Sequence, residues 1–303
     1  MAKVFITGIT GFLGSSIARY LVDKGHDIIG LYRHGSSLQL LESIENKITL
    51  VLQENDWVSN IISHKPHVVI HAAWAGVGHN DRDNWDSQLL NIDYLKQVLT
   101  IGKNSGAVKF IGLGSQAEYG TFNGMIDEHY PASPKEAYGC VKVICTEFVK
   151  QYCNYYDINW YWLRLFSFYG KEESERWLIP SMVKKMLTEK EMDLTEGEQK
   201  YAYLYVGDLG LAINNIIVKP GRSGIYNISG SSLIKLRDLV ERIRDVVNKS
   251  FTLNFGRLPY RANQSMHIQG NSLKFKKEFG EFEVSDFDAS LLATINGLIK
   301  RFK

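Results

Sequence analysis

The sequence is poor in the features that mark several whole classes of protein. Its only three cysteines, Cys140, Cys145 and Cys153, match no zinc-binding spacing and are odd in number. Lys and Arg total 35 against 33 Asp and Glu, without a dense basic block, so no nucleic-acid partner is expected. No apolar run approaches the roughly 18 residues of a membrane span, and the N-terminus does not resemble a signal peptide. We therefore expect buried thiols in a cytoplasmic enzyme of bacterial type, without metal or membrane contact.

Linkers, repeats and low-complexity segments are also missing, so no change in composition marks a domain boundary. What the first half does contain is compact apolar runs that alternate with helical periodicity. The expected strands are Val4–Thr7, Ile28–Tyr32, Thr49–Leu52, Val68–His71, Phe110–Leu113 and Trp160–Leu165, and the expected helices are Ser15–Lys24, Leu89–Lys103 and Tyr138–Tyr155. Units of about 30 residues predict parallel βαβ connections and an α/β, doubly wound parallel sheet of the Rossmann type.

The pattern loosens after residue 165. We expect a strand at Ile225–Ile228 and helices at Pro180–Leu187, within Leu204–Val218, at Leu236–Asn248 and near Ala289–Lys300. The 303 residues then divide into a dinucleotide-binding domain, 1–165, and a smaller C-terminal α/β substrate lobe, 166–303. Part of 200–230 is expected to return to the first domain.

A glycine-rich turn, Gly8-Ile9-Thr10-Gly11-Phe12-Leu13-Gly14, follows the first strand and opens the first helix. Glycine allows a tight turn and close approach of a pyrophosphate, and the free N–H groups of a helix start attract the anion. A tight turn without a ligand is the less favoured alternative. The predicted cofactor contacts from this turn are Gly8, Thr10, Gly11, Phe12, Leu13 and Gly14.

The second strand ends in Leu31-Tyr32-Arg33-His34-Gly35-Ser36-Ser37, with no acidic residue to bind the ribose 2′-hydroxyl of NAD. A guanidinium fork suits the 2′-phosphate of NADP instead. Arg33 and Ser36 therefore favour NADP, with NAD as the alternative. The other interpretation of Arg33 is a solvated residue that stacks on adenine.

Tyr138 and Lys142 form a YxxxK motif at the start of a helix, where i, i+4 spacing puts both on one face. An ammonium beside the phenol is expected to lower the pKa of Tyr138 from about 10 toward neutrality, which suits a general acid–base. Lys142 can also donate to the nicotinamide ribose. Ser115 stands at the carboxyl end of a strand, where open α/β sheets bind ligands, and can hold a substrate oxygen against the phenol. A strand-end hydroxyl bonded to backbone is the alternative for Ser115.

These motifs, in this order, resemble those of the extended short-chain dehydrogenase/reductase superfamily, in the branch of nucleotide-sugar epimerases, dehydratases and 4-ketoreductases. Residues 114–120, GSQAEYG, match a pattern with a Ser or Thr four residues before Tyr-Gly. Residues 68–73, VVIHAA, resemble the strand whose backbone runs along the cofactor, which implies contacts from His71, Ala72 and Ala73, and Asn91 resembles a structural asparagine. The resemblance implies a nicotinamide cofactor, also held by Tyr138 and Lys142.

Three later segments, 164–170, 205–208 and 259–261, resemble the family's sugar-nucleotide site. With the residue after Ser115, they imply substrate contacts from Gln116, Ser167 and Arg261. For Arg261 the alternative is a surface position. For Tyr169, Tyr205 and Asp208, packing and helix capping are at least as favoured as ligand contact. Ser167 replaces the family's usual Asn, and Tyr201, beside Lys200, replaces its usual diphosphate-binding Arg, which leaves the nucleotide open.

Departures beside Ser115 narrow the reaction. The family's 4,6-dehydratases place acidic or polar groups at the two positions that are Gln116 and Ala117 here. Ala117 transfers no proton, and Glu118 on an extended trace is expected to point away. The family's 3,5-epimerising members have a Cys at the position of Ala117 and a His after Tyr-Gly, where this chain has Lys171-Glu172. Both reactions are disfavoured.

The remaining groups suit hydride transfer alone. We predict NADP-dependent reduction of a 4-keto nucleotide sugar in the synthesis of deoxysugars or cell-surface glycan precursors. A nucleotide-sugar 4-epimerase with retained NAD is the alternative, and a 4,6-dehydratase or an inactive NAD(P)-binding scaffold is less favoured. Family members commonly dimerise through the YxxxK helix and its neighbour, so a homodimer is expected, with Val143, Phe148 and Tyr152 at the interface or in the core.

Overall fold

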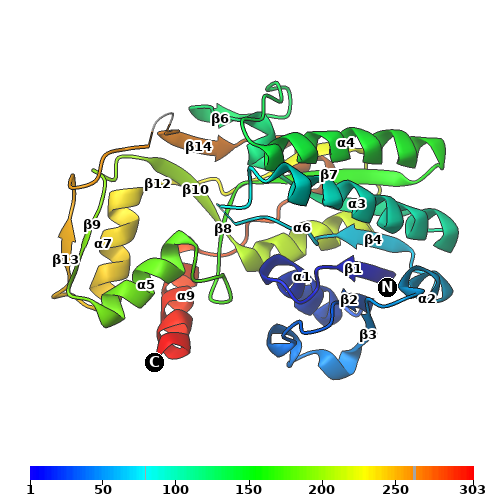
Figure 1. Ribbon diagram of the computed structural model, residues 1–303, viewed down its shortest axis with the longest axis horizontal. Helices are drawn as coiled ribbons and strands as arrows, with labels where there is room; N and C mark the ends of the chain where they lie inside the picture. Colours follow the sequence, from blue (N-terminus) through cyan, green and yellow to red (C-terminus); the bar gives the residue numbers. More distant parts are fainter. Residues whose placement is uncertain (79, 262–263) are drawn as a thin grey trace.

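A seven-stranded sheet forms the centre of the larger lobe (Figure 1). The structure is a computed structural model and describes residues 1–78, 80–261 and 264–303. In spatial order the strands are β11 (Gly224–Ile228), β7 (Asn159–Leu165), β5 (Lys109–Ser115), β4 (Val68–His71), β1 (Lys3–Thr7), β2 (Asp27–Tyr32) and β3 (Ile48–Leu52). All neighbours pair in parallel. The order reverses between β1 and β4, so the crevice at their carboxyl ends is the expected ligand position.

The strands of this sheet are apolar because both faces are covered. Val4 and Ile6 of β1 face one hydrophobic cluster and Phe5, between them, faces the other, as the two-residue period of a strand requires. All three side chains are fully buried. The doubly wound parallel sheet predicted from the sequence is confirmed.

Helices pack on both faces of the sheet (Figure 1). One face carries α1 (Phe12–Asp23), α6 (Val206–Val218) and α8 (Leu273–Phe279), and the other carries α2 (Trp57–Ser63), α3 (Trp85–Ser105) and α4 (Ala137–Tyr155). The sequence analysis misses α2 and α8 because each has only seven residues, too few to show a helical period. Three short 3-10 helices connect elements of this lobe: η1 (Gln39–Leu41), η2 (Glu45–Lys47) and η3 (Gln116–Tyr119).

The smaller lobe combines a mixed sheet with three helices. Its sheet contains β12 (Leu233–Lys235), β10 (Lys200–Tyr205), β14 (His267–Gly270) and β6 (Gly124–Ile126), with β8 (Ser167–Tyr169) also paired to β10. A separate pair is formed by β9 (Glu191–Asp193) and β13 (Thr252–Asn254). The helices are α5 (Leu178–Thr188), α7 (Leu236–Val247) and α9 (Phe287–Phe302), which share an apolar core.

The chain passes between the lobes several times. β6 comes from the first half of the sequence but pairs with β14 in the smaller lobe. In the other direction, α6 packs on α1, and β11 pairs with β7 to become an edge of the large sheet. Residues 206–228 thus lie in the larger lobe, and α8 joins them there, beyond the 200–230 segment expected to return. The division at residue 165 stays a prediction.

The cysteines are free thiols, and Cys145 and Cys153 are buried in α4. Cys140 is only half-buried, so the prediction of three buried thiols is wrong at this position. It lies in the first turn of α4, between the buried residues Gly139 and Val141. Among the described residues no helix is long and apolar enough to cross a membrane.

Helix α8, near the end of the chain, is expected to contribute to the stability of the larger lobe. Phe279 is fully buried in the cluster that contains β1 and α1, whereas Leu273, on the same helix, is 56% exposed. Replacing Phe279 by Ala leaves a cavity, so Phe279→Ala is expected to lower the free energy of unfolding by about 3 to 5 kcal/mol. Urea unfolding measures this, with Leu273→Ala as the matched control. Equal effects of the two substitutions would contradict the packing of α8 on this core.

Candidate active site

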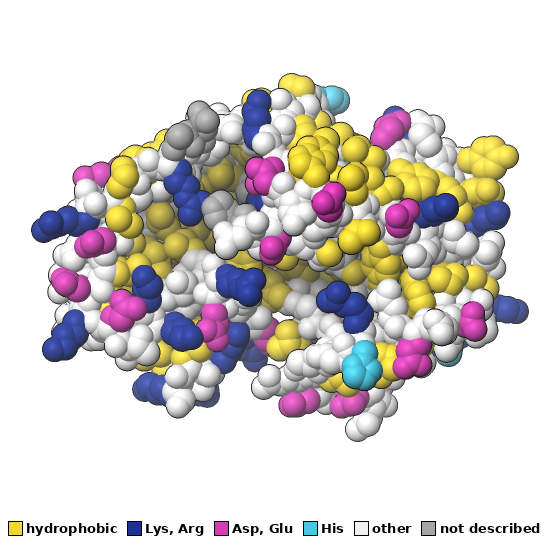
Figure 2. Space-filling view, in the orientation of Figure 1, with side chains coloured by type: hydrophobic (Ala, Val, Ile, Leu, Met, Phe, Trp, Pro, Cys, Tyr) yellow, Lys and Arg dark blue, Asp and Glu magenta, His cyan; other side chains and the backbone are white. Residues whose placement is uncertain are grey.

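A cavity of about 1430 Å³ lies between the two lobes. The carboxyl ends of β2 and β5 and the turns that follow β1 and β4 line one side, and α5, β9 and β10 line the other. Figure 2 shows this region as a hollow with hydrophobic side chains inside it and Lys and Arg side chains at its rim. The cavity therefore occupies the crevice where ligands of doubly wound sheets bind.

The glycine turn has the geometry of a phosphate cradle. Gly8 has a φ of +69°, and a Cβ there would lie 2.7 Å from the backbone nitrogen of Ala73. A Cβ on Gly14 would lie 2.1 Å from the carbonyl oxygen of Gly8. Gly11 is the N-cap of α1 and brings no side-chain oxygen to the first turn, so the N–H groups there stay free for an anion. The turn thus fits a dinucleotide pyrophosphate.

Nearly all residues predicted to hold the cofactor line the cavity. Those that do are Gly8, Thr10, Gly11, Phe12, Leu13, Gly14, Arg33, Ser36, Ala72, Ala73, Tyr138 and Lys142. Arg33 is exposed at the end of β2 and Ser36 is half-buried, in a turn closed by a hydrogen bond from the Ser36 nitrogen to the Arg33 carbonyl oxygen. Their cofactor contacts stay predictions.

His71 is the exception, because it lies beneath the cavity wall and not at its surface. Its Nδ1 lies 3.0 Å from Thr7 Oγ1, which accepts a hydrogen bond from the Ala73 nitrogen at 3.2 Å. Burial, with a contribution from the charge of Lys142, lowers the pKa of His71 to about 3, so the ring is neutral. His71 thus supports the backbone at Ala73 from below. Tyr94, which sequence reasoning misses, has its ring centre 5.5 Å from that of His71 at a tilt of 54°, and it lines the cavity.

The structure brings Ser115, Tyr138 and Lys142 together on the cavity wall. Ser115 is the last residue of β5, and its Oγ accepts a hydrogen bond from the Ala117 nitrogen at 3.1 Å. A hydroxyl has one donor and two acceptor positions, so the Ser115 hydrogen stays available to a neighbour. Its hydroxyl is close enough to the phenol of Tyr138, in the first turn of α4, to oppose the rise in the pKa of that phenol. The catalytic role of the three residues stays a prediction.

The electrostatics of Tyr138 differ from the sequence-based expectation. Burial raises the pKa of Tyr138, and the largest opposing effect comes from Arg82, whose guanidinium lies 4.6 Å from the centre of the phenol ring. Lys142 donates to the Leu113 carbonyl oxygen at 2.5 Å and lies 3.5 Å from the Trp74 ring centre. Burial also lowers the pKa of Lys142 to about 7. The prediction that Lys142 lowers the phenol's pKa toward neutrality is therefore wrong here, because the amine points at the backbone.

Arg82 and Trp74 belong to the connection between β4 and α3, and sequence reasoning misses both. Arg82 is also bound to the start of α4, since its carbonyl oxygen accepts from the Tyr138 nitrogen at 2.8 Å and its Nη1 pairs with Glu136 at 2.9 Å. Trp74 meets the Tyr138 ring edge-on at 6.0 Å. Neither residue belongs to a motif, so only the fold reveals that they touch the phenol.

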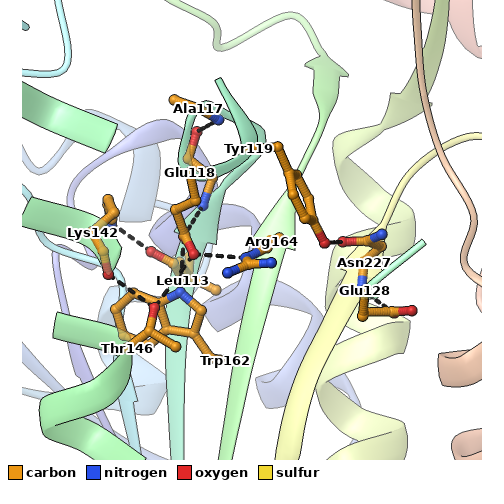
Figure 3. Close-up of polar contacts among 11 residues, drawn as sticks. Leu113, Ala117, Glu118, Tyr119, Glu128, Lys142, Thr146, Trp162, Arg164 and Asn227 are labelled. Atoms are coloured by element: carbon orange, nitrogen blue, oxygen red, sulfur yellow. Dashed lines mark hydrogen bonds and ion pairs between the residues drawn. The ribbon is translucent and has the colours of Figure 1, made fainter. Parts of the chain in front are cut away.

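The buried carboxylate of Glu118 binds the backbone of Ser115, and Figure 3 shows it among Trp162, Arg164 and Thr146. Glu118 is fully buried, and its Oε1 accepts from the Ser115 nitrogen at 2.8 Å and from Trp162 Nε1 at 2.9 Å. Its Oε2 accepts from Arg164 Nε at 2.7 Å and from Thr146 Oγ1 at 3.3 Å. The extended trace expected around Glu118 is wrong, because η3 is a 3-10 helix that turns this side chain into the interior. As predicted, Glu118 does not reach the cavity.

The residues predicted to contact substrate all line the cavity, although their contacts stay predictions. Gln116 has a buried Oε1 without a hydrogen-bond partner in the described part of the chain. Ser167 begins β8, and Arg261 is exposed on the opposite wall. Tyr201, which replaces the family's diphosphate arginine, also lines the cavity and accepts from Gln264 Nε2 at 3.0 Å.

The other family-like positions have structural roles. Tyr169 is 1% exposed, with its hydroxyl against Ser290 at 2.5 Å, and Asp208 accepts from the Ser285 hydroxyl at 2.8 Å. Neither residue lines the cavity, and neither does Tyr205, which is half-buried against the apolar core of the smaller lobe. Asn91 binds the Ala75 backbone through its Oδ1 at 2.8 Å and its Nδ2 at 3.2 Å. Packing and hydrogen bonds within the protein therefore account for the first three, and Asn91 secures the connection after β4.

Comparisons with known proteins agree with this site. The family model described as the NAD dependent epimerase/dehydratase family matches residues 4–229. A dTDP-6-deoxy-L-talose 4-dehydrogenase (NAD(+)) from Aggregatibacter actinomycetemcomitans is 26% identical, over 88% of this chain and 99% of that protein. An uncharacterised UDP-glucose epimerase of Bacillus subtilis (strain 168) is 25% identical, over 84% of both chains. A UDP-N-acetylglucosamine 4-epimerase structure from Methanobrevibacter ruminantium M1 superimposes with a TM-score of 0.88 at 20% identity, over 99% of each chain.

The matched segment contains the glycine turn, Ser115 and the YxxxK motif, and it covers most of the chain. The chain therefore belongs to the NAD dependent epimerase/dehydratase family. Within that family it is an enzyme of the extended short-chain dehydrogenase/reductase type, a nicotinamide-dependent oxidoreductase.

The contacts of Glu118 predict that the stability of the fold depends on the negative charge of this buried carboxylate. Glu118→Gln leaves Arg164 buried without its carboxylate and is expected to lower the free energy of unfolding by about 3 to 5 kcal/mol. The matched control, Asp288→Asn, removes one partner of an exposed ion pair with Arg242 and is expected to change little. Chemical unfolding followed by tryptophan fluorescence checks both. A Glu118→Gln protein as stable as the control would refute this role of the carboxylate.

Proposed function

We propose that this enzyme reduces a 4-keto nucleotide sugar with NADPH, in the synthesis of deoxysugars or cell-surface glycan precursors. The observation that carries the proposal is the set of groups beside Ser115. Ala117 transfers no proton, and Glu118 is fully hydrogen-bonded in the interior. Tyr138 and Lys142 are then the proton-transferring side chains next to Ser115 on the cavity wall. That set suits hydride transfer at one carbon and gives no second acid–base pair for eliminating water.

The roles follow from the geometry. Ser115 holds the substrate carbonyl oxygen with its free hydroxyl hydrogen, next to the Tyr138 phenol. A bound nicotinamide dinucleotide supplies the hydride. Tyr138 gives its proton to the carbonyl oxygen as the new C–H bond forms, and a buried phenol with a raised pKa is protonated and ready to do so at neutral pH. The Arg82 guanidinium over the ring stabilises the phenolate that remains.

A nucleotide-sugar 4-epimerase is the second candidate. It would use the same three residues and let a 4-keto intermediate rotate within the cavity before the hydride returns. The relatives point both ways, since one is named a 4-dehydrogenase of a dTDP-6-deoxysugar and the other a UDP-glucose epimerase. The two reactions differ in whether the protein retains its nicotinamide cofactor between turnovers. A 4-epimerase regenerates its cofactor and retains it, whereas a reductase releases the oxidised cofactor after each turnover.

Tyr138→Phe and the identity of the bound nucleotide test this proposal together. The variant is expected to lose turnover by at least about a hundredfold, since it lacks the proton donor, and to bind NADPH as the wild type does. Oxidation of NADPH with 4-keto-6-deoxy dTDP- and CDP-sugars measures the reaction. NAD recovered from denatured purified protein, with interconversion of C4 epimers, would establish the epimerase instead. Equal turnover of Tyr138→Phe and wild type would refute the mechanism.

The choice of NADP rests on Arg33 and on the absence of an acidic residue in 31–37. We predict that Arg33→Ala lowers kcat/KM for NADPH by roughly 10- to 100-fold, the effect of losing a charge-assisted hydrogen bond, and leaves that for NADH nearly unchanged. His34→Ala, at the exposed next position, is the control. The dTDP-6-deoxy-L-talose 4-dehydrogenase that this chain resembles carries NAD(+) in its name, so the wild-type ratio of kcat/KM for NADPH and NADH decides between the two cofactors. A clear preference for NADH would refute the proposal.

A homodimer through α3 and α4 also remains our proposal. The two helices pack side by side, and Leu89, Leu90 and Ile144 on them are 44%, 66% and 44% exposed. Figure 2 shows hydrophobic side chains gathered on this part of the surface. Phe148 and Tyr152 are half-buried, so each packs against the core and also reaches the surface. Val143 is half-buried on the same helix.

A cytoplasmic location is likewise proposed, supported by the three free thiols.

A further inference from the structure

One buried acidic residue of the cavity takes no part in the mechanism above. Glu173 lies in the connection between β8 and α5, lines the cavity and is 7% exposed. Its backbone is fixed at both ends, because its nitrogen donates to the Gly170 carbonyl oxygen at 3.1 Å and its carbonyl oxygen accepts from Arg301 Nη1 at 2.7 Å. The side chain is therefore held at the cavity by the fold.

The carboxyl group of Glu173 has neither a hydrogen bond nor an ion pair within the described residues. Arg301 on α9 binds its backbone oxygen and approaches the carboxylate of Glu175 instead. Arg176, on the same connection, is exposed, and Tyr203 on β10 is the titratable neighbour whose pKa the Glu173 charge raises further. Burial raises the pKa of Glu173 to about 8, so its carboxyl is mostly protonated at neutral pH.

A buried, unpaired acid makes the fold less stable than an amide or an apolar side chain would. The wall on this side of the cavity carries apolar side chains, among them Ile179, Met182 and Leu194. It also carries the charged side chains of Arg176 and Lys185, neither of which pairs with Glu173 in the described part of the chain. Such a position is where a ligand, and not the protein, is expected to supply the missing partner. A neutral carboxyl donates one hydrogen bond and accepts others, which matches a sugar hydroxyl or carbonyl.

We propose that Glu173 is a specificity residue of the substrate cavity that donates a hydrogen bond to a neutral oxygen of the bound sugar. The proposal rests on the proposed function, since it assumes a nucleotide sugar in this cavity. The proposal adds a pH dependence of sugar binding that hydride transfer itself does not require. Once Glu173 ionises, the donor is lost and a negative charge stands in its place, so the affinity for the neutral sugar falls above about pH 8.

Calorimetric binding tests this without turnover. UDP-, dTDP-, CDP- and GDP-glucose are screened, and the tightest binder is titrated at pH 6.5 and pH 9 into wild type, Glu173→Gln, Glu173→Leu and the control Glu175→Gln. Glu175 is exposed two residues further on and pairs with Lys184. At pH 9 about one wild-type molecule in ten keeps the proton, so the Kd is expected to rise about tenfold relative to Glu173→Gln. The control is expected to follow wild type.

Glu173→Gln keeps a donor and is expected to bind at pH 6.5 within about twofold of wild type, whereas Glu173→Leu binds there about as weakly as wild type at pH 9. Lys142 also titrates in this range but is common to all four proteins, so the difference between them isolates Glu173. Parallel pH dependence of wild type and Glu173→Gln would overturn the proposal. Binding of none of the four nucleotides would overturn both this proposal and the proposed function, and a pH effect without ketone reduction would overturn the proposed function alone.

Thermal unfolding gives a second measurement that needs no ligand. The folded-state pKa of Glu173 lies above its unfolded value, so wild-type stability falls as pH rises from about 5 to 8 and levels off above that. Glu173→Gln lacks this loss, and its melting temperature is expected to exceed that of wild type by a margin that grows over the same range. An unchanged margin would show that the Glu173 carboxyl is already ionised and would overturn the proposal.

Discussion

The position of Ser115 depends on a carboxylate that never reaches the cavity. Glu118 gathers the Ser115 nitrogen, Trp162 and Arg164 of β7, and Thr146 of α4 around two oxygen atoms. A buried carboxylate is costly unless each of its oxygens is paired, so β5, β7 and α4 must meet at this point in one arrangement. The end of β5 is thereby held still on the side away from the ligand, and the geometry at Ser115 follows from the packing behind it.

Glu173, which does line the cavity, is a buried acid in the opposite situation. The carboxylate of Glu118 accepts hydrogen bonds from four protein groups, whereas the carboxyl of Glu173 makes none with the described residues. The contacts of Glu118 stabilise one geometry of the fold. The unpaired carboxyl of Glu173 lowers the stability of the fold but leaves a group that a ligand can bind. Burial also shifts the pKa of Lys142 and Glu173 toward the physiological range, to about 7 and about 8. Two groups of this cavity are therefore sensitive to small changes in pH.

The large sheet is predictable from sequence because its strands are apolar runs buried on both faces, such as Val68–His71. The glycine turn, Ser115 and Tyr138 are equally predictable because local spacing places them. Strands of three residues, such as β9 and β12, carry no period to recognise, and only tertiary pairing creates them. Arg82 and Glu173 escape prediction for a similar reason, since each comes from an irregular connection. The direction in which the Lys142 amine points depends on the Trp74 ring, which no motif contains.

The strand that completes the large sheet, β11, comes from residues 224–228, and the helix that covers it, α8, from 273–279. During synthesis on the ribosome, β7 must therefore wait as an unpaired edge while more than fifty further residues are added. An exposed edge rich in tryptophan and tyrosine is prone to pair with other chains. The sheet that begins with the first residues of the chain is thus among the last parts of the fold to be completed.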